Sequence, residues 1–293
     1  MRQRGWSWPA ATTDVSDAPH PLLTGAPLLI AHRGGAGLYP ENTLYAFTRA
    51  HEMWQADMLE LDVRATADGH CVVFHDPTVD RTTNGTGDVA SMTLAELQQL
   101  DAGYHFTRDG GGTFPLRGRG VRVPTIDEVL RALPTMPITV EVKTGAAQRP
   151  LFDALDAAGA RDRIILASAY DRDRTLFHEW TGALSASVEH GRRFYKLHRL
   201  HCARFGSMYA HVAQTPELWN DRRIVTPRFV RDVHRSGSHV HIWTVNETAD
   251  MDRLLDWGVD GLVTDRPDRL ARVLHARVGR PLPPGDPDLP RLA

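Results

Sequence analysis

The chain has 293 residues, of which 42% are hydrophobic, and this is enough for one large domain with an extensive core. Lysine and arginine together number 34, aspartate and glutamate 36, so the formal charge at pH 7 is −2. This balance excludes the strongly basic surface of a general nucleic-acid-binding protein, and an anionic ligand would have to be attracted by a local group of cations.

The two ends of the chain are predicted to lie outside the folded domain. Residues 1–25 lack the continuous apolar stretch of a signal peptide, and residues 279–293 are too rich in proline for a helix or central strand. No run approaches the roughly 20 apolar residues of a membrane span. Cys71 and Cys202 form neither a disulfide framework nor a zinc-binding spacing. We therefore expect a domain over residues 26–278 in a cytoplasmic protein without stable membrane insertion.

The first predicted strand covers residues 28–32. Its apolar run ends abruptly at His32 and Arg33, so both polar side chains are expected at the carboxyl end of a buried strand. A helical pattern follows over residues 43–56, and Thr43 is suited to capping its start.

The second predicted strand, residues 58–63, carries two carboxylates. Because successive side chains of a strand point to opposite faces, Glu60 and Asp62 share one face while their apolar neighbours pack behind. Two carboxylates on one face repel each other unless a cation joins them. A hard divalent ion such as Mg²⁺ or Ca²⁺, with Mn²⁺ as a further option, satisfies this requirement.

A hairpin is predicted after this strand, because Asp68-Gly69 is a favoured two-residue turn. Pairing outward from that turn sets Asp62 opposite His75 and makes residues 71–75 a return strand. This strand is expected to rise above the rim of the barrel that the complete set of strands predicts. Residues 80–123 then interrupt the alternation of strands and helices, with six glycines between positions 103 and 120. We expect this segment to be a small insertion over the barrel mouth.

Six more strands are predicted along the rest of the chain. In residues 138–142 the alternation places Glu141 on the same face as Lys143. The others are 163–167, 184–188, 208–212, 239–244 and 261–264, with a helical pattern over 227–236. Eight strands favour an α/β TIM (β/α)8 barrel. An open doubly wound sheet would alternate similarly, but the polar candidates lie at the ends of well-separated strands, as in barrels.

Eight short motifs in a fixed order then resemble one family. They are His32-Arg33-Gly34, Pro40-Glu41-Asn42-Thr43, Glu60-Leu61-Asp62, His75-Asp76, the run from Arg81 to Gly87, Glu141-Val142-Lys143, and the segments 241–246 and 261–267. Over residues 26–275 the chain resembles the glycerophosphodiester phosphodiesterases. The resemblance implies a barrel of the phospholipase-C-like phosphodiesterase type, one divalent metal ion held by three carboxylates, and two histidines acting as acid and base.

Carried over by position, the resemblance implies a role for eight side chains. The metal ligands would be Glu60, Asp62 and Glu141, the acid and base His32 and His75, the phosphate contacts Arg33 and Lys143, and the wall of the glycerol pocket Trp243. The sequence leaves open which histidine is the acid, and whether water or the glycerol 2-hydroxyl attacks phosphorus.

Three functions remain open at this point. The resemblance favours hydrolysis of glycerophosphodiesters to an alcohol and sn-glycerol 3-phosphate. A lysophospholipase D activity on single-chain phospholipids would need an apolar groove at the mouth, and the basic, aromatic stretch of residues 192–201 is its only hint. A phosphate-binding protein without turnover would not need an acid and a base.

Overall fold

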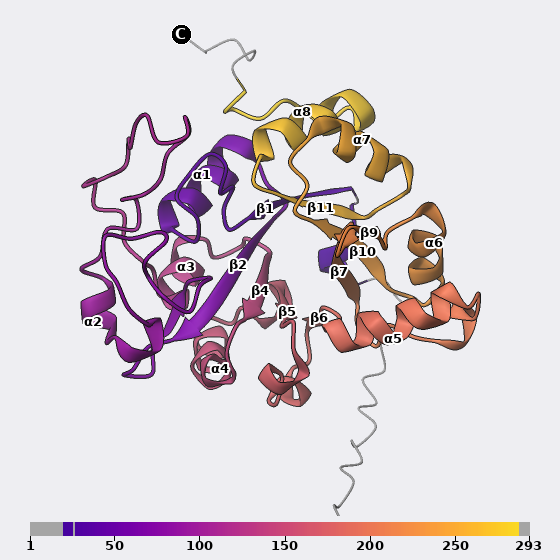
Figure 1. Ribbon diagram of the computed structural model, residues 1–293, viewed down its shortest axis with the longest axis horizontal. Helices are drawn as coiled ribbons and strands as arrows, with labels where there is room; N and C mark the ends of the chain where they lie inside the picture. The colour runs from indigo at the N-terminus through magenta and orange to yellow at the C-terminus, as the bar shows by residue number, and fades with distance from the viewer. Residues whose placement is uncertain (1–19, 26, 287–293) are drawn as a thin grey trace, which may run out of the picture.

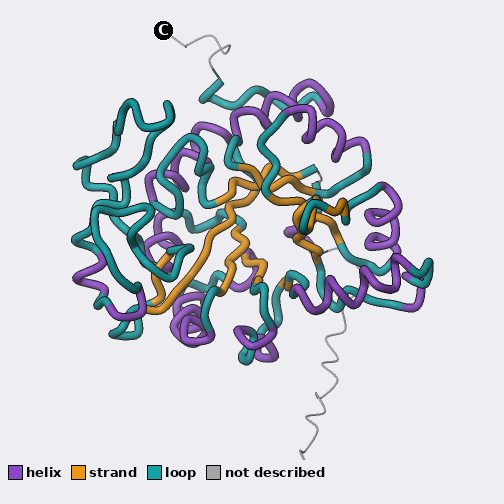
Figure 2. The backbone as a smooth tube through the Cα atoms, in the orientation of Figure 1, coloured by secondary structure: helices purple, strands orange, loops and turns teal. Residues whose placement is uncertain are grey.

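The computed structural model describes residues 20–25 and 27–286. Within them, eight parallel strands surround a central axis and the helices lie outside the ring (Figure 1, Figure 2). The barrel strands are β1 (Leu28–His32), β2 (Met58–Ala65), β4 (Ile138–Val142), β5 (Ile164–Ala167), β6 (Ala183–Leu184), β7 (Val212–Pro216), β10 (His239–Trp243) and β11 (Gly261–Thr264). A parallel bridge between Ser185 and Val212 closes the ring, so the predicted barrel is confirmed.

The helices are α1 (Leu44–Trp54), α2 (Leu94–Leu97), α3 (Ile126–Ala132), α4 (Gln148–Ala157), α5 (Val188–Arg199), α6 (Pro227–Arg235), α7 (Thr248–Asp256) and α8 (Pro267–Val278). Short 3-10 turns, among them η1 (Pro21–Leu23) and η7 (Ala203–Phe205), connect several elements. The predicted cap is confirmed, since the Thr43 side chain accepts a hydrogen bond from the backbone N–H of Ala46. No helix of the described residues has both the length and the apolar character needed to cross a bilayer.

Two predicted strands differ from the observed ones by several residues, and three others by one or two at an end. The strand expected at 184–188 ends at Leu184, because Ser187 already caps α5 by accepting a hydrogen bond from His190 N–H. The strand expected at 208–212 begins only at Val212, because Tyr209 has a φ of +51° and interrupts the extended backbone. Residues 28–32, 138–142 and 261–264 match the observed β1, β4 and β11.

The predicted hairpin register was wrong by one residue. Strand β3 (Cys71–Val73) pairs antiparallel with β2 so that Val63 lies opposite Val73, and Asp62 accepts a hydrogen bond from Phe74 N–H instead of facing His75. The connection is a three-residue loop closed by Thr66 N–H donating to His70 O, with Gly69 at a φ of +83°. Glycine adopts this left-handed conformation without strain.

The insertion over residues 80–123 lies beside the barrel. It packs against β3 around a small core of its own, formed by Val72, Phe74, Val79, Val89, Leu97, Ala102, Val121 and Val123. In the view of Figure 1 this segment, which carries α2, lies to the left of the strand ring, and no residue of it lines the cavity at the mouth. The insertion therefore flanks the mouth of the barrel. The prediction that it lies over the mouth is corrected accordingly.

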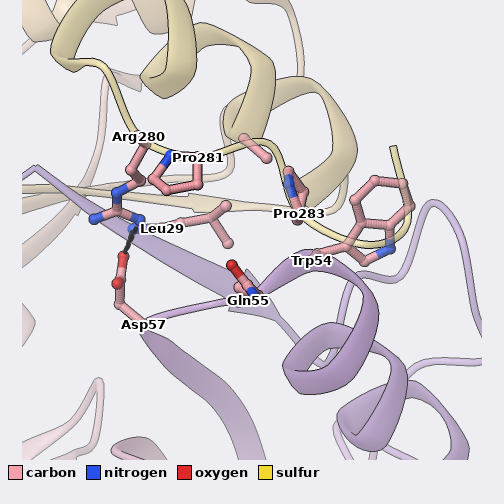
Figure 3. Close-up of a pocket in the computed structure, with 8 residues that line it drawn as sticks. Leu29, Trp54, Gln55, Asp57, Arg280, Pro281 and Pro283 are labelled. Carbon is pink, nitrogen blue, oxygen red and sulfur yellow. Dashed lines mark hydrogen bonds and ion pairs between the residues drawn. The ribbon is translucent and has the colours of Figure 1, made fainter. Parts of the chain in front are cut away.

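Both predicted tails also need correction. Residues 1–19 and 287–293 lie outside the described residues, but Leu23 of η1 is 1% exposed and packs inside the amino-terminal end of the barrel. At the other end, Arg280 pairs with Asp57 at 2.6 Å (Figure 3). Gly285 N–H donates to Met53 O. Residues 280–286 are thus part of the packed fold.

A polar layer lies inside the barrel below the cavity. Gln214 donates to Thr139 Oγ1 at 3.2 Å, and both side chains line the cavity. His241 is 0% exposed, and neither of its ring nitrogens has a hydrogen-bond partner among the described residues. Burial lowers the pKa of His241 to about 4, so the ring is neutral at ordinary pH.

Candidate active site

A cavity of about 700 Å³ opens at the carboxyl ends of the barrel strands. This is the end at which the loops of TIM barrels build active sites. All eight side chains singled out from the sequence line this one cavity: His32, Arg33, Glu60, Asp62, His75, Glu141, Lys143 and Trp243. The structure thus brings together residues that are up to 211 positions apart in the chain.

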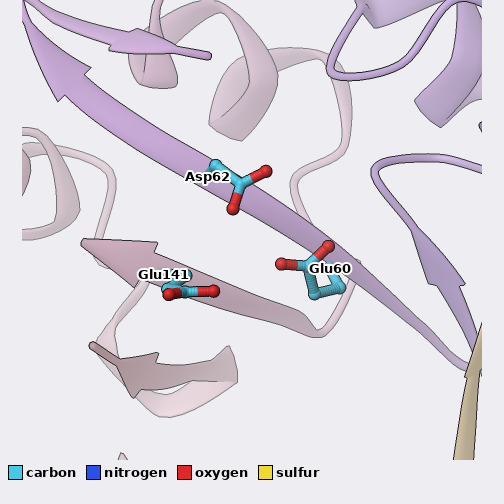
Figure 4. A group of neighbouring side chains, drawn as sticks. All are labelled: Glu60, Asp62 and Glu141. Atoms are coloured by element: carbon cyan, nitrogen blue, oxygen red, sulfur yellow. The ribbon is translucent and has the colours of Figure 1, made fainter. Parts of the chain in front are cut away.

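Three carboxylates converge at the inner wall. Glu60 and Asp62 share a face of β2, and the parallel register with β4 sets Glu141 beside Asp62. One oxygen of each group lies within 4.8 Å of one oxygen of the other two (Figure 4). This all-oxygen donor set could hold a metal ion, and its chemistry fits a hard divalent cation.

The surroundings shift the pKa values of the two carboxylates of β2 in opposite directions. Burial, with the nearby charge of Asp62, raises the pKa of Glu60. The pKa of Asp62 is lowered despite burial, because Lys143 and Arg33 stabilise its charged form. The cations of the protein therefore compensate Asp62 and leave Glu60 poorly compensated, and a divalent ion would stabilise both carboxylates.

Two cations lie against the acidic cluster. Lys143 Nζ is 2.9 Å from Asp62 Oδ1 and 3.0 Å from Glu141 Oε2. Arg33 Nε is 3.3 Å from Asp62 Oδ2, while its Nη1 donates to Glu41 at 2.8 Å. Both cations are thus held at the edge of the carboxylates, where a bound anion could approach them.

The backbone at the end of β1 requires glycine. Arg33 has a φ of +50°, and the next residue, Gly34, has a φ of +85°. A Cβ at Gly34 would lie 2.7 Å from Ala46 Cβ and 2.9 Å from Phe47 Cδ1 on helix α1. This close approach lets the chain turn at the strand end and directs the Arg33 side chain to the cluster.

Each histidine has a carboxylate behind it. His32 Nδ1 lies 2.6 Å from Asp265 Oδ1, and His75 Nδ1 lies 2.6 Å from Asp76 Oδ1. A carboxylate on Nδ1 keeps the proton there and leaves Nε2 as the reactive nitrogen. Burial alone would lower the pKa of His32, but Asp265 and Glu60 together raise it above its ordinary value.

Comparison of the sequence with known proteins agrees with this geometry. The family model of the glycerophosphoryl diester phosphodiesterases matches residues 32–269. The chain belongs to this family. It is 34% identical over 258 residues to a glycerophosphodiester phosphodiesterase of Caldanaerobacter subterraneus, covering 85% of this chain and 98% of the relative. A Bacillus subtilis glycerophosphodiester phosphodiesterase is 31% identical over 266 residues, with 84% of this chain and 86% of the relative covered.

Solved structures show the same fold. A glycerophosphoryl diester phosphodiesterase domain from Mycobacterium tuberculosis superposes with a TM-score of 0.73 at 23% identity, covering 86% of this chain and 100% of that one. An Oleispira antarctica phosphodiesterase, solved in complex with its product sn-glycerol 3-phosphate, gives a TM-score of 0.68 at 24% identity, covering 86% and 98%. These likenesses show that the chain has the barrel fold of these structures.

Two partners of the site residues, Asp265 and Arg81, were not assigned a role from the sequence. Asp265 follows β11 directly and accepts from both His32 and Asn246. The strand-end argument that singled out His32 applies equally to Asp265, so this signal was present. Arg81 donates to Asp76 at 2.6 Å and through two nitrogens to Glu41 at 2.7 Å. Its contact depends on how the insertion folds, so spacing alone could not reveal it.

The cavity continues away from the acidic cluster into a region we call the side lobe. We define it by the lining residues between positions 185 and 224. They come from the β6–α5 connection, α5, β7 with the loop before it, and the hairpin of β8 (Leu218–Trp219) and β9 (Arg222–Arg223). Its wall is largely apolar, with Ala186, Val188, Tyr195, Met208, Trp219 and Ile224. Arg192, Arg199 and Arg222 complete it. This is the stretch in which the motifs of the family are absent.

Proposed function

We propose that this protein is a metal-dependent glycerophosphodiester phosphodiesterase that releases an alcohol and sn-glycerol 3-phosphate. The observation that carries the proposal is the convergence of three carboxylates and two carboxylate-backed histidines on one cavity. The product bound in the structure of the Oleispira antarctica phosphodiesterase supports sn-glycerol 3-phosphate as the shared product.

In this proposal Glu60, Asp62 and Glu141 hold one Mg²⁺ or Ca²⁺. The ion, when bound, supplies positive charge that offsets the negative charge developing on the phosphoryl group. Arg33 presents a planar fork of donors to the phosphate oxygens, and Lys143 acts as a point charge. Together these side chains orient the diester and favour its charged transition state.

The two histidines divide the proton transfers. One removes the proton from the attacking hydroxyl, which belongs to water or to the glycerol 2-position, and the other donates a proton to the departing alcohol. Asp265 and Asp76 hold the two rings in the tautomer that presents Nε2 to the substrate. Trp243, 41% exposed at the end of β10, forms a wall against which the glycerol carbons pack.

A second candidate, lysophospholipase D activity, is favoured by one observation. The apolar wall of the side lobe, including Val188, Met208 and Ile224, could contact an acyl chain. A non-catalytic binding barrel is disfavoured, because both histidines keep a carboxylate partner that ligand binding does not require.

We also propose a reducing cytoplasmic setting, supported by the free state of Cys71 and Cys202.

The test compares products from three substrates. Purified protein is incubated with glycerophosphoglycerol, glycerophosphocholine and lysophosphatidylcholine, and phosphorus NMR identifies the products. We expect sn-glycerol 3-phosphate from at least one soluble diester and none from the His32→Ala variant. Acyl-glycerol phosphate as the main product would favour the second candidate. Binding of the diesters without turnover would contradict the proposed hydrolysis.

A further inference from the structure

The charged side chains of the side lobe all have one sign. Outside the catalytic centre, the described residues that line the cavity include three charged side chains, namely Arg192, Arg199 and Arg222, and no carboxylate. Two of them lie on one helix, α5, seven positions apart, and the third lies on β9. Residues seven apart on a helix lie close to the same face, two turns from each other.

These arginines also lack the ion pairs that nearby arginines have. Arg223, next in sequence, pairs with Glu217 at 2.8 Å, and Arg253 pairs with the same carboxylate at 2.7 Å. In the described part of the chain, no carboxylate makes an ion pair with Arg192, Arg199 or Arg222. Their positive charge is therefore available to a bound ligand.

Two aromatic rings that line the cavity, those of Trp219 and Tyr170, are already covered by cations of the protein. The guanidinium carbon of Arg192 lies 5.8 Å from the centre of the Trp219 ring, and that of Arg172 lies 4.6 Å from the centre of the Tyr170 ring. A quaternary ammonium group such as choline is recognised on free aromatic faces. Here it would meet arginines instead, and like charges repel.

We propose that Arg192, Arg199 and Arg222 form an anion-binding subsite for the alcohol portion of the substrate. This inference rests on the proposed function. It makes the enzyme selective for glycerophosphodiesters whose alcohol carries a second phosphate or phosphodiester group, and selective against choline. An acyl chain would use the apolar wall but leave the three guanidinium groups unpaired, whereas an anionic alcohol pairs with them.

The test uses three soluble substrates with the same glycerophosphoryl half. Bis(glycerophospho)glycerol carries a second phosphodiester on its alcohol, glycerophosphoglycerol has an uncharged alcohol, and glycerophosphocholine a cationic one. Initial rates give kcat/KM for each with the native protein, the Arg192→Gln/Arg199→Gln/Arg222→Gln variant, and the Arg193→Gln variant. Arg193 is the matched control, because it is exposed on the same helix but does not line the cavity.

The native protein is expected to prefer the anionic substrate over the uncharged one and the uncharged one over the cationic one. Exposed ion pairs contribute about two- to fivefold each, so the triple variant should lower the ratio of anionic to uncharged kcat/KM by about tenfold or more. The loss should appear in KM, and added salt should reduce the native preference. The Arg193→Gln control should keep the native ratio.

Other outcomes overturn the inference. Equal kcat/KM values for the three substrates, an unchanged ratio in the triple variant, or an equal change of the ratio in the control would each refute an arginine subsite. These results remain distinguishable from a failure of the proposed function itself. If the proposed function itself fails, none of the three diesters is hydrolysed by the metal-loaded native protein.

Discussion

The catalytic centre and the side lobe share one cavity but are built differently. The carboxylates and cations of the centre lie on or directly after three neighbouring strands, β1, β2 and β4. Most of them are buried and paired, with Asp62 only 1% exposed between Arg33 and Lys143. The lobe is formed by a helix and a hairpin, and its arginines are exposed and unpaired with carboxylates among the described residues.

This difference separates chemistry from selectivity. A buried, paired charge cannot be changed without leaving its partner uncompensated, so substitutions in the centre should cost much of the rate. An exposed cation contributes about 1 kcal/mol or less, so the lobe can change its preference by small steps. We therefore expect large effects in the centre and graded ones toward its periphery.

The largest effect is expected for Asp62→Asn. The substitution removes a carboxylate of the acidic cluster and leaves Lys143 and Arg33 without their shared partner. Because a catalytic metal contributes several kcal/mol, kcat/KM should fall by about a thousandfold or more. Steady-state kinetics measure the loss of kcat/KM, and titration with the metal ion by calorimetry measures the loss of metal affinity. Asp153→Asn, an exposed position on α4, should leave both values near native, and a native rate in Asp62→Asn would contradict the assignment.

The next effect concerns the carboxylate behind a histidine. Asp265→Asn keeps the size of the side chain but removes its negative charge and exchanges one acceptor oxygen for an NH₂ donor, so the proton on Nδ1 of His32 is no longer held firmly. A histidine acting in proton transfer contributes about a hundred- to ten-thousandfold, so kcat should fall at least about a hundredfold while KM changes little. The pKa of His32 in the pH–rate profile should fall as well, because Asp265 raises this pKa in the native protein. A fall confined to KM would show that Asp265 serves binding and not His32.

The polar layer below both regions gives a prediction for stability. Because the pKa of His241 is lowered to about 4 in the fold, the unfolded chain binds the proton first as the pH falls below the ordinary value. The free energy of unfolding therefore decreases as the pH falls from the ordinary pKa of histidine toward about 4. From about pH 7 to about pH 5 the native protein should lose about 2 kcal/mol more than His241→Gln. Urea unfolding at both pH values measures this, and equal losses would contradict it.

A smaller effect is expected where the insertion contacts the centre. Arg81 bridges Glu41 and Asp76, and Asp76 contacts Nδ1 of His75. Arg81→Met should lower kcat by about tenfold, because His75 loses part of its support while keeping its own carboxylate. Arg81→Lys keeps the charge but cannot make the three contacts, so it should recover only part of the rate. Full activity of both variants would show that the bridge does not position His75.

The sequence predicted the acidic cluster well, for a simple physical reason. Alternation along a strand predicted that Glu60 and Asp62 share one face. The resemblance added Glu141, which the parallel pairing of β2 with β4 sets beside them. The hairpin register failed because Asp68-Gly69 also fits a three-residue loop, and the Thr66 side chain, which accepts from His70 N–H, stabilises that loop.

The periphery of the site was much less predictable. Arg81 reaches Glu41 only through the fold of the insertion, across 40 positions of sequence. The three arginines of the side lobe come from α5 and β9, and no local pattern says that a helix and a hairpin will face one cavity. Local rules describe strand faces and strand ends, whereas these contacts depend on the packing of whole elements.

Dependence of the hydrolysis on a metal ion can be measured with protein from which bound metal has been removed. Protein stripped with a chelator is assayed for release of sn-glycerol 3-phosphate from glycerophosphoglycerol, before and after addition of Mg²⁺, Ca²⁺ or Mn²⁺. We expect no release from the stripped protein, recovery with at least one of these ions, and no recovery in Asp62→Asn. Full release without any metal, or none with every metal, would contradict the metal-dependent hydrolysis proposed for this cavity.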